Sequence, residues 1–270
     1  MPREITAYSN PLVKRLRLLR EKRHRREQGM FLAEGLRILT EALDAGHVPL
    51  WLVFAADSAG HPLVRRLVAA TEDAGGEAIQ TSRDILHKLS GKDNPQAVVG
   101  VYADLKLDLA GLDRATAPIW LVAQALRDPG NLGTILRTGD AVGAGGLILI
   151  DDCVDPFSVE SVRASMGALF TQKIATARWP DFLQWLRGGP GQLVGTSLKT
   201  DIDYQQPRYQ APTFILSGNE AQGLPQDYEA ACDLLVRMPM LGKADSLNAA
   251  VATAVMAYEV LNQQRSAVKG

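Results

Sequence analysis

Residues 119–150 read IWLVAQALRDPGNLGTILRTGDAVGAGGLILI, and this stretch decides the fold. Two near-continuous apolar runs, Ile119–Ala125 and Gly146–Ile150, flank a segment with helical spacing of its apolar residues. Further apolar runs follow at Leu193–Ser197 and Phe214–Leu216. Apolar strands that alternate with helices are typical of a parallel sheet covered on both faces. We therefore predict an α/β domain with a parallel sheet in the C-terminal half of the chain.

Three loops that follow strands of this predicted sheet are rich in glycine and in hydrogen-bonding groups. They are residues 128–137, 217–225 and 238–248. In parallel α/β sheets, ligands bind beyond the carboxyl ends of the strands, where the loops lead into helices. The sequence therefore predicts that these three loops form the functional site.

Single residues in the three loops also have purely structural interpretations. Asn131 is a good N-cap for the helix that opens near Asp128, and Ser246 is a candidate N-cap for the last helix. A lone carboxylate such as Glu220 is typical of a helix cap or a surface charge, and Arg137 is typical of an exposed salt bridge. From the residues alone, both interpretations stay open.

The N-terminal half shows a second, smaller alternation of helices and strands. Its expected helices and strands are 35–45, 50–55, 62–74, 77–81, 83–89 and 97–102. The stretch 105–118 has weaker patterning and contains Asp and Gly, which is typical of a connection between domains. We predict an N-terminal domain at 1–108, a linker at 109–117 and a C-terminal domain at 118–270.

A strongly basic segment lies between Lys14 and Arg26, where eight lysines and arginines accompany one glutamate. Leu12, Leu16 and Leu19 recur at three- and four-residue spacing, so the segment is expected to be one helix with an apolar stripe. Its cations are either a solvated surface or a surface that contacts the phosphates of a nucleic acid. The candidate RNA-contacting residues are Lys14, Arg15, Arg23 and Arg26.

Composition and missing motifs exclude several classes of protein. The 270 residues are 46% hydrophobic, and the net charge of −1 argues against binding of nucleic acid by overall charge alone. The chain lacks an apolar run long enough for a membrane span and an apolar signal-peptide core, so we expect a cytoplasmic protein. Cys153 and Cys232 lack the spacing of a zinc or redox site, and no metal is expected. GxxxxGK[ST], GxSxG, HExxH and a strand-linked GxGxxG are absent, which disfavours nucleotide hydrolysis, serine hydrolysis, zinc chemistry and nicotinamide binding.

Taken together, the loop segments resemble the SpoU/TrmH family of RNA ribose methyltransferases, in the SPOUT superfamily. NLGTILRT (131–138), SGNEAQGL (217–224) and MPMLGKADSLNAAVATAVMAYE (238–259) are similar to the three motifs of that family and occur in the same order. DPFSVESVRASMGALF (155–170) and the basic region 9–39 also resemble family segments. Gly139, Val142 and Ala249 depart from the commoner Ala, Phe and Val, which leaves the polar motif residues intact.

The resemblance implies a fold, a cofactor and a set of site residues. The expected fold is a Rossmann-like parallel sheet with a C-terminal deep trefoil knot, preceded by a small αβα substrate-binding domain that holds RNA. The expected cofactor is S-adenosylmethionine, and homodimerisation through the catalytic domain is expected. The residues that match the family's catalytic positions are Asn131, Arg137, Glu220, Ser246 and Asn248. The expected cofactor contacts lie near Thr196, Gly218, Met238 and Leu247.

The resemblance leads to a hypothesis for the reaction and leaves alternatives. A guanidinium with a pKa above about 12 holds its proton tightly, so we expect Arg137 to stabilise the developing oxyanion, with a substrate phosphate or water as proton acceptor. Glu220 is expected to orient its neighbours, and Ser246 with Asn248 to position the ribose or its phosphate. We expect ribosomal RNA as the substrate. The alternatives are transfer RNA, methylation of a base atom, and an RNA-binding ribosome factor without activity.

Overall fold

The computed structural model describes residues 2–90 and 96–267, which divide into two compact units. The first unit comprises the chain up to Leu105 together with Asp155–Thr171, and the second comprises Lys106–Val154 and the chain from Gln172 onward. A segment from the middle of the chain thus packs with the N-terminal unit. The predicted domain boundaries at 108 and 118 stay a prediction.

The second unit is built on a seven-stranded sheet in which all neighbouring strands are parallel, which confirms the predicted parallel sheet. The strand order is β12-β10-β11-β7-β8-β9-β6. Trp120, Ile148 and Phe214 lie in its core, each fully buried. The strands are β6 (Lys106–Leu107), β7 (Ile119–Gln124), β8 (Leu147–Ile150), β9 (Ile174–Ala177), β10 (Gln192–Thr196), β11 (Thr213–Ser217) and β12 (Leu234–Val236).

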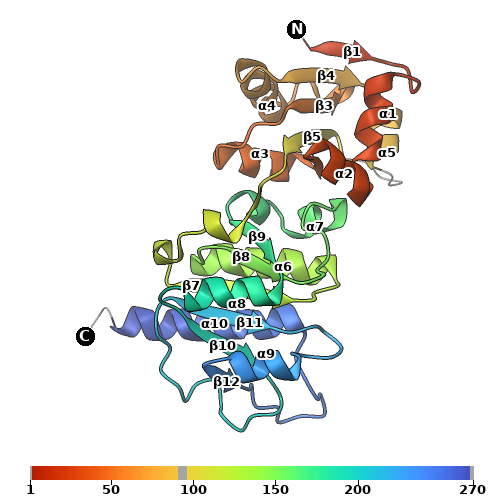
Figure 1. Cartoon of the computed structure of the whole chain (residues 1–270). Helices are drawn as coiled ribbons and strands as arrows, with labels where there is room; N and C mark the ends of the chain where they lie inside the picture. The colour runs from red at the N-terminus through yellow and green to blue at the C-terminus, as the bar shows by residue number, and fades with distance from the viewer. Residues whose placement is uncertain (1, 91–95, 268–270) are drawn as a thin grey trace. The chain divides into compact units, whose positions relative to one another are not determined.

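Helices pack on this sheet (Figure 1). The long C-terminal helix packs against α6 and against the central strands β11 and β7, while the apolar face of α8 joins the core through Phe182 and Leu186. The predicted linker contains two 3₁₀ turns, Leu109–Gly111 and Arg114–Thr116. The helices are α6 (Pro129–Val142), α8 (Trp179–Arg187), α9 (Gln226–Ala231) and α10 (Ala249–Ala267).

The caps of α6 and α10 differ from the sequence-based expectation. Asp128 caps α6, because its carboxylate accepts a hydrogen bond of 2.7 Å from the backbone N–H of Asn131. Asn248 accepts hydrogen bonds from the N–H groups of Ala250 and Val251, so Asn248, not Ser246, occupies the capping position of α10. Both expected caps were therefore wrong: the side chains of Asn131 and Ser246 do not cap these helices.

The first unit contains a smaller mixed sheet with the strand order β1-β4-β3-β5-β2. β1, β4 and β3 run parallel, whereas β5 runs antiparallel to β3 and β2. Its strands are β1 (Arg3–Ile5), β2 (Met30–Glu34), β3 (Trp51–Ala55), β4 (Glu77–Thr81) and β5 (Val98–Ala103). Its helices are α1 (Pro11–Leu18), α2 (Lys22–Gln28), α3 (Leu36–Asp44), α4 (Pro62–Asp73), α5 (Arg83–Ser90) and α7 (Val159–Ala164), with 3₁₀ turns at Ala56–Ser58 and Ala168–Phe170.

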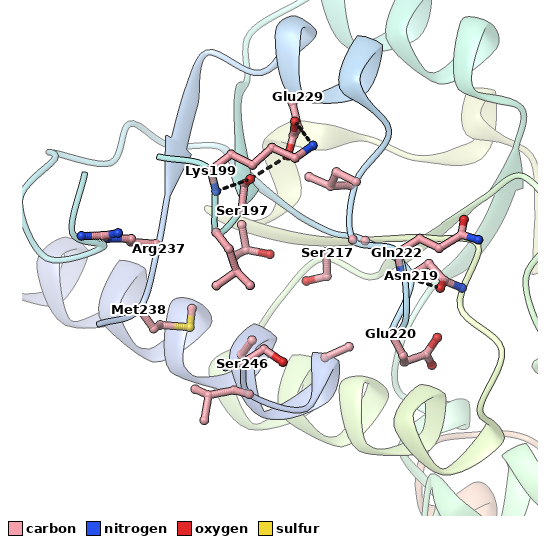
Figure 2. A pocket seen from close by; sticks show the side chains of 18 of the residues that line it. Ser197, Lys199, Ser217, Asn219, Glu220, Gln222, Glu229, Arg237, Met238 and Ser246 are labelled. Atoms are coloured by element: carbon pink, nitrogen blue, oxygen red, sulfur yellow. Dashed lines mark hydrogen bonds and ion pairs between the residues drawn. The ribbon is translucent and has the colours of Figure 1, made fainter. Parts of the chain in front are cut away.

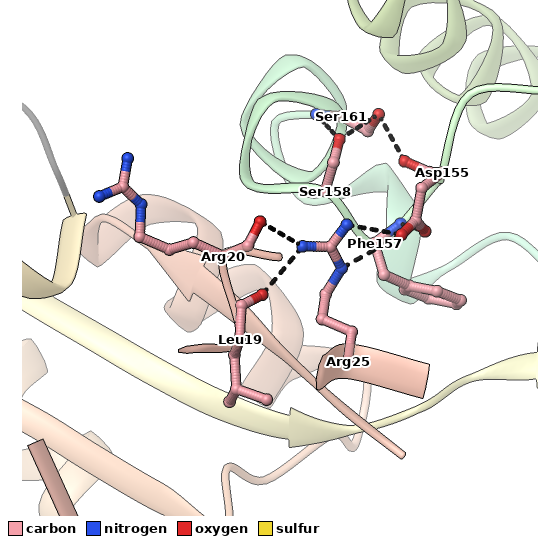
Figure 3. Close-up of polar contacts among 7 residues, drawn as sticks. All are labelled: Leu19, Arg20, Arg25, Asp155, Phe157, Ser158 and Ser161. Carbon is pink, nitrogen blue, oxygen red and sulfur yellow. Dashed lines mark hydrogen bonds and ion pairs between the residues drawn. The ribbon is translucent and has the colours of Figure 1, made fainter. Parts of the chain in front are cut away.

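The basic segment is two short helices rather than the single helix that its leucine spacing predicts. The helix is interrupted between α1 and α2, where Leu19 is fully buried. The guanidinium of Arg25 donates hydrogen bonds to the carbonyl groups of Leu19 and Arg20, which terminates α1 (Figure 3). Arg25 also forms an ion pair of 2.6 Å with Asp155, and its side chain is only 6% exposed. Arg25, although it belongs to the basic segment, therefore has a structural role: it links the end of α1 to Asp155.

Candidate active site

The turns after β7 and β11 and the start of α10 are joined by a chain of side-chain hydrogen bonds. Asn131 Nδ2 donates to Glu220 Oε1 at 3.0 Å, and Asn248 Nδ2 donates to Asn131 Oδ1 at 2.8 Å. Asn131 thus links the second loop to the third, although 89 and 117 residues separate it from these partners. The structure brings three of the five expected catalytic residues into direct contact.

Glu220 is held as a hydrogen-bond acceptor at the centre of this network. Its two oxygens also accept hydrogen bonds of 3.3 Å from the backbone N–H groups of Arg127 and Asp128. Burial alone would raise the pKa of Glu220, but the hydrogen bonds from Asn131 and from the backbone outweigh it, so the pKa lies below its ordinary value. An ionised carboxylate with these partners orients the loops rather than donating a proton.

The second loop approaches the first through backbone groups as well. Asn219 Nδ2 donates to the carbonyl oxygen of Ala125 at 2.8 Å, and Ala125 has a positive φ of 47°. A Cβ atom at Gly218 would lie 2.4 Å from the carbonyl carbon of Gly223, so only glycine allows this tight turn. The strained turn and the glycine together place Glu220 over the first loop.

A pocket of about 290 Å³ opens beside these turns (Figure 2). Its volume is close to the lower end of the range for small-molecule pockets, roughly 300–1,000 Å³. The four expected cofactor contacts, Thr196, Gly218, Met238 and Leu247, all line it. The lining combines buried apolar side chains with two carboxylates, those of Glu220 and Glu229, and two cationic side chains, those of Lys199 and Arg237.

The expected catalytic residues lie at different distances from this pocket. Glu220 and Ser246 line it, and Asn131 and Asn248 reach it through their hydrogen bonds to Glu220 and to each other. Arg137 is exposed on α6 and is not among the residues that line the pocket. Its side chain is thus accessible to solvent and lies outside the pocket wall.

Sequence reasoning missed three polar residues of the pocket wall: Ser197, Lys199 and Glu229. Glu229 lies on α9, and its carboxylate binds the side chains of Ser197 and Lys199 (Figure 2). None of the three lies in a recognised motif, and about 30 residues separate Glu229 from its partners. Only the fold brings them together, so no local signal in the sequence could have identified them.

The four candidate RNA-contacting residues are exposed on α1 and α2 of the first unit. Arg15 Nε donates to Gln28 Oε1 at 2.8 Å, and its guanidinium carbon lies 5.3 Å from the ring centroid of Trp51. Arg23 pairs with Glu27 one helical turn away, at 2.7 Å. The exposure of these cations is compatible with phosphate contacts.

Within residues 2–90 and 96–267, the structure groups no three His, Cys, Asp or Glu side chains in a way that would hold a metal ion. None of the described helices combines the length and apolar character that crossing a membrane requires.

Comparison with known proteins covers both units. Residues 118–258 match the SpoU rRNA Methylase family, and residues 10–100 match the MRM3-like substrate binding domain. An uncharacterised tRNA/rRNA methyltransferase from Synechocystis is 35% identical over 97% of this chain and 95% of its own length. A 23S rRNA (uridine(2479)-2′-O)-methyltransferase from Streptomyces viridochromogenes is 32% identical over 92% of this chain and 88% of its own. The crystal structure of an AdoMet-bound rRNA methyltransferase from Sinorhizobium meliloti has a TM-score of 0.89 and 39% identity, over 96% of this chain and 97% of its own.

Proposed function

This chain is a member of the SpoU rRNA methylase family, and from that membership we propose that it methylates a ribose 2′-hydroxyl of ribosomal RNA with S-adenosylmethionine. The observation that carries the proposal is the chain of hydrogen bonds from Asn248 through Asn131 to Glu220 at the edge of the pocket. These bonds fix three loops against one another, and fixed geometry is what an in-line methyl transfer requires.

The residues of the pocket fit S-adenosylmethionine. When bound, this cofactor supplies a methyl group on a positively charged sulfur. The ionised carboxylate of Glu220 lines the pocket and suits the positively charged sulfur, and buried Leu224 and Val236 offer an apolar surface for the adenine ring. Thr196, Gly218, Met238 and Leu247 would hold the cofactor. The Sinorhizobium relative was crystallised with AdoMet bound.

Within this reaction, we assign Arg137 to the ribose oxygen. Its guanidinium is exposed on α6, whose first turn carries Asn131, so it is accessible to an RNA that approaches from solvent. A positive charge beside the 2′-oxygen stabilises the negative charge that develops as the hydroxyl loses its proton. The proton passes to water or to a substrate phosphate. Glu220 and Asn131 orient the loops, and Ser246 and Asn248 position the ribose or its phosphate.

Ribosomal RNA is favoured over transfer RNA by the N-terminal unit. Residues 10–100 match a substrate-binding domain, and the Streptomyces relative, whose name specifies 23S rRNA, aligns over both units. The Synechocystis relative is named for both kinds of RNA, so transfer RNA is the second candidate.

The test is transfer of a labelled methyl group to separated RNA fractions. Purified protein is incubated with labelled S-adenosylmethionine and with ribosomal or transfer RNA from a strain that lacks the gene. We expect label in ribosomal RNA, and mapping of 2′-O-methyl sites in the two strains then identifies the nucleotide. Label in transfer RNA alone would favour the second candidate, and RNA binding without any label would indicate a factor without activity.

We also propose that the protein is a homodimer through its catalytic domain. On α10, Val251 and Tyr258 are 46% and 53% exposed, and Leu247 just before it is 38% exposed. Apolar side chains exposed along one helix support an interface. Light scattering should give twice the chain mass of 29.2 kDa, and Tyr258→Glu should shift it toward the monomer. A wild-type mass of one chain would contradict the dimer.

The family resemblance further leads us to propose the trefoil knot and a cytoplasmic location. β12 lies at the edge of the sheet, yet α10, which follows it, packs against central β11 and β7, so residues 237–248 carry the chain back across the sheet. This path supports a threaded C-terminus. A crystal structure in which residues 237–248 pass outside the preceding loops would contradict the knot, and cell fractionation tests the location.

A further inference from the structure

One side of the pocket is a polar cluster that the expected catalytic residues do not include. It consists of Ser197 and Lys199, in the turn that leaves β10, and Glu229 on α9. All three line the pocket, and Figure 2 shows them across the cavity from Glu220. The side chain of Glu229 is only 9% exposed, whereas that of Lys199 is 66% exposed. A carboxylate this deeply buried requires partners.

Both oxygens of Glu229 are bound by the turn. Ser197 Oγ donates to Oε1 at 2.6 Å, and Lys199 Nζ donates to Oε2 at 2.9 Å. The backbone N–H of Lys199 donates to Ser197 Oγ at 3.1 Å, which closes the turn on itself. Burial alone would raise the pKa of Glu229, but the hydrogen bonds from Ser197 and Lys199 outweigh it and lower the pKa. The carboxylate is therefore an ionised anchor.

The anchored turn lies next to the apolar part of the pocket. Thr196 is paired with Val236 in the sheet, and Leu224 lies beside Gly195; Val236 and Leu224 are buried and line the pocket. An apolar surface of this kind suits a purine ring, whereas the doubly charged amino-acid end of the cofactor favours water. The position of the turn thus determines the shape of the part of the pocket that suits the nucleoside.

We propose that Glu229 is a positioning residue of the cofactor pocket, which holds the turn 197–199 in the shape that receives the adenosyl group. The inference rests on the proposed function, because it takes S-adenosylmethionine as the ligand. Glu229 acts through Ser197 and Lys199 and does not touch the reacting atoms. Its loss widens the nucleoside side of the pocket and leaves the hydrogen bonds of Asn131, Glu220 and Asn248 in place.

The test compares two ligands by calorimetry on the full-length protein. S-adenosylmethionine and 5′-methylthioadenosine share the adenosyl group, but only the first carries the amino-acid end and the positive charge on sulfur. Glu229→Ala should weaken both by the same factor, about tenfold, since hydrogen bonds to a buried charged group are lost. Glu229→Gln retains an acceptor for Ser197 and should lose about threefold. Asp227→Asn, an exposed acid on the same helix, is the matched control and should bind like wild type.

Kinetics and a second variant keep the proposal testable if Glu229→Ala does not fold. Ser197→Ala breaks the same link from the other side and should weaken both ligands too. In methyl transfer, Glu229→Gln should raise KM for S-adenosylmethionine while kcat at saturation stays near the wild-type value.

Unchanged affinity for both ligands in Glu229→Gln and Ser197→Ala would overturn the proposal. Weaker binding of S-adenosylmethionine alone would also overturn it, since that result means that Glu229 acts directly on the amino-acid end or on the charged sulfur. If the wild-type protein itself did not bind S-adenosylmethionine, the proposed function would be wrong. If the wild type binds it and the variants bind it equally well, only the role proposed for Glu229 is wrong.

Discussion

The pocket of the second unit and the basic helices of the first unit use polar side chains in opposite ways. Around the pocket, Glu220 accepts three hydrogen bonds from residues 127–131, and Glu229 accepts two from the turn 197–199. On α1 and α2, by contrast, Lys14 and Arg26 are exposed to solvent. Groups held by hydrogen bonds can align reacting atoms, while exposed cations bind phosphates with release of counterions. Arg25 lies in the basic segment yet is buried, so burial rather than residue type decides the role.

Removing Arg25 tests this distinction most strongly. Arg25→Met leaves Asp155, whose side chain is 14% exposed, without its ion-pair partner and the carbonyls of Leu19 and Arg20 without the guanidinium donor. We expect the free energy of unfolding to fall by about 3–5 kcal/mol, measured by denaturant titration. Arg23→Met, in an exposed pair, is the control and should leave the unfolding midpoint unchanged. Equal effects of the two changes would mean that Arg25 is merely another surface cation.

Arg137 is an exposed residue to which we assign a role in the chemistry. Arg137→Ala should lower kcat about 100- to 1,000-fold, which is typical of losing a group that stabilises an oxyanion, and should leave the Kd for S-adenosylmethionine near wild type. Arg208→Ala removes an exposed arginine of the same unit and should retain activity. Steady-state methyl transfer measures kcat, and calorimetry measures the Kd. Near-normal turnover of Arg137→Ala would remove this residue from the mechanism.

Replacing Asn131 tests whether the hydrogen bonds between the loops matter for methyl transfer. Asn131→Ala removes the hydrogen bonds to Glu220 and from Asn248, each worth about 1 kcal/mol or more where the partner is charged or buried. We expect kcat to fall about 10- to 100-fold. Thr134→Ala, on an exposed position of the same helix, serves as the control. A kcat equal to wild type would show that the network is dispensable.

Charge reversal on the basic helices should have the smallest effect. Changing Arg15, Arg23 and Arg26 to Glu should weaken RNA binding about tenfold and reduce the slope of log Kd against log salt by about 2–3. Filter binding at several salt concentrations measures both. An unchanged slope would mean that these cations are solvated and do not contact RNA.

The sequence predicted what depends on local patterns. The strands at 119–124 and 213–217 were recognised from the apolar runs 119–125 and 214–216, and the rule for parallel sheets placed Asn131 near Glu220. The break between α1 and α2 was missed because it depends on Asp155, which lies 130 residues from Arg25. Glu229 was missed for the same reason: its partners are assembled only by the folded sheet.

The most direct measurement is the chemical position of the transferred methyl group. RNA labelled by the enzyme is hydrolysed in alkali, which cleaves only where a free 2′-hydroxyl can attack the neighbouring phosphate. If the pocket presents the methyl group to a ribose oxygen, the label must remain in an alkali-resistant dinucleotide. Label released in a mononucleotide would place the methyl on a base and contradict the assignment.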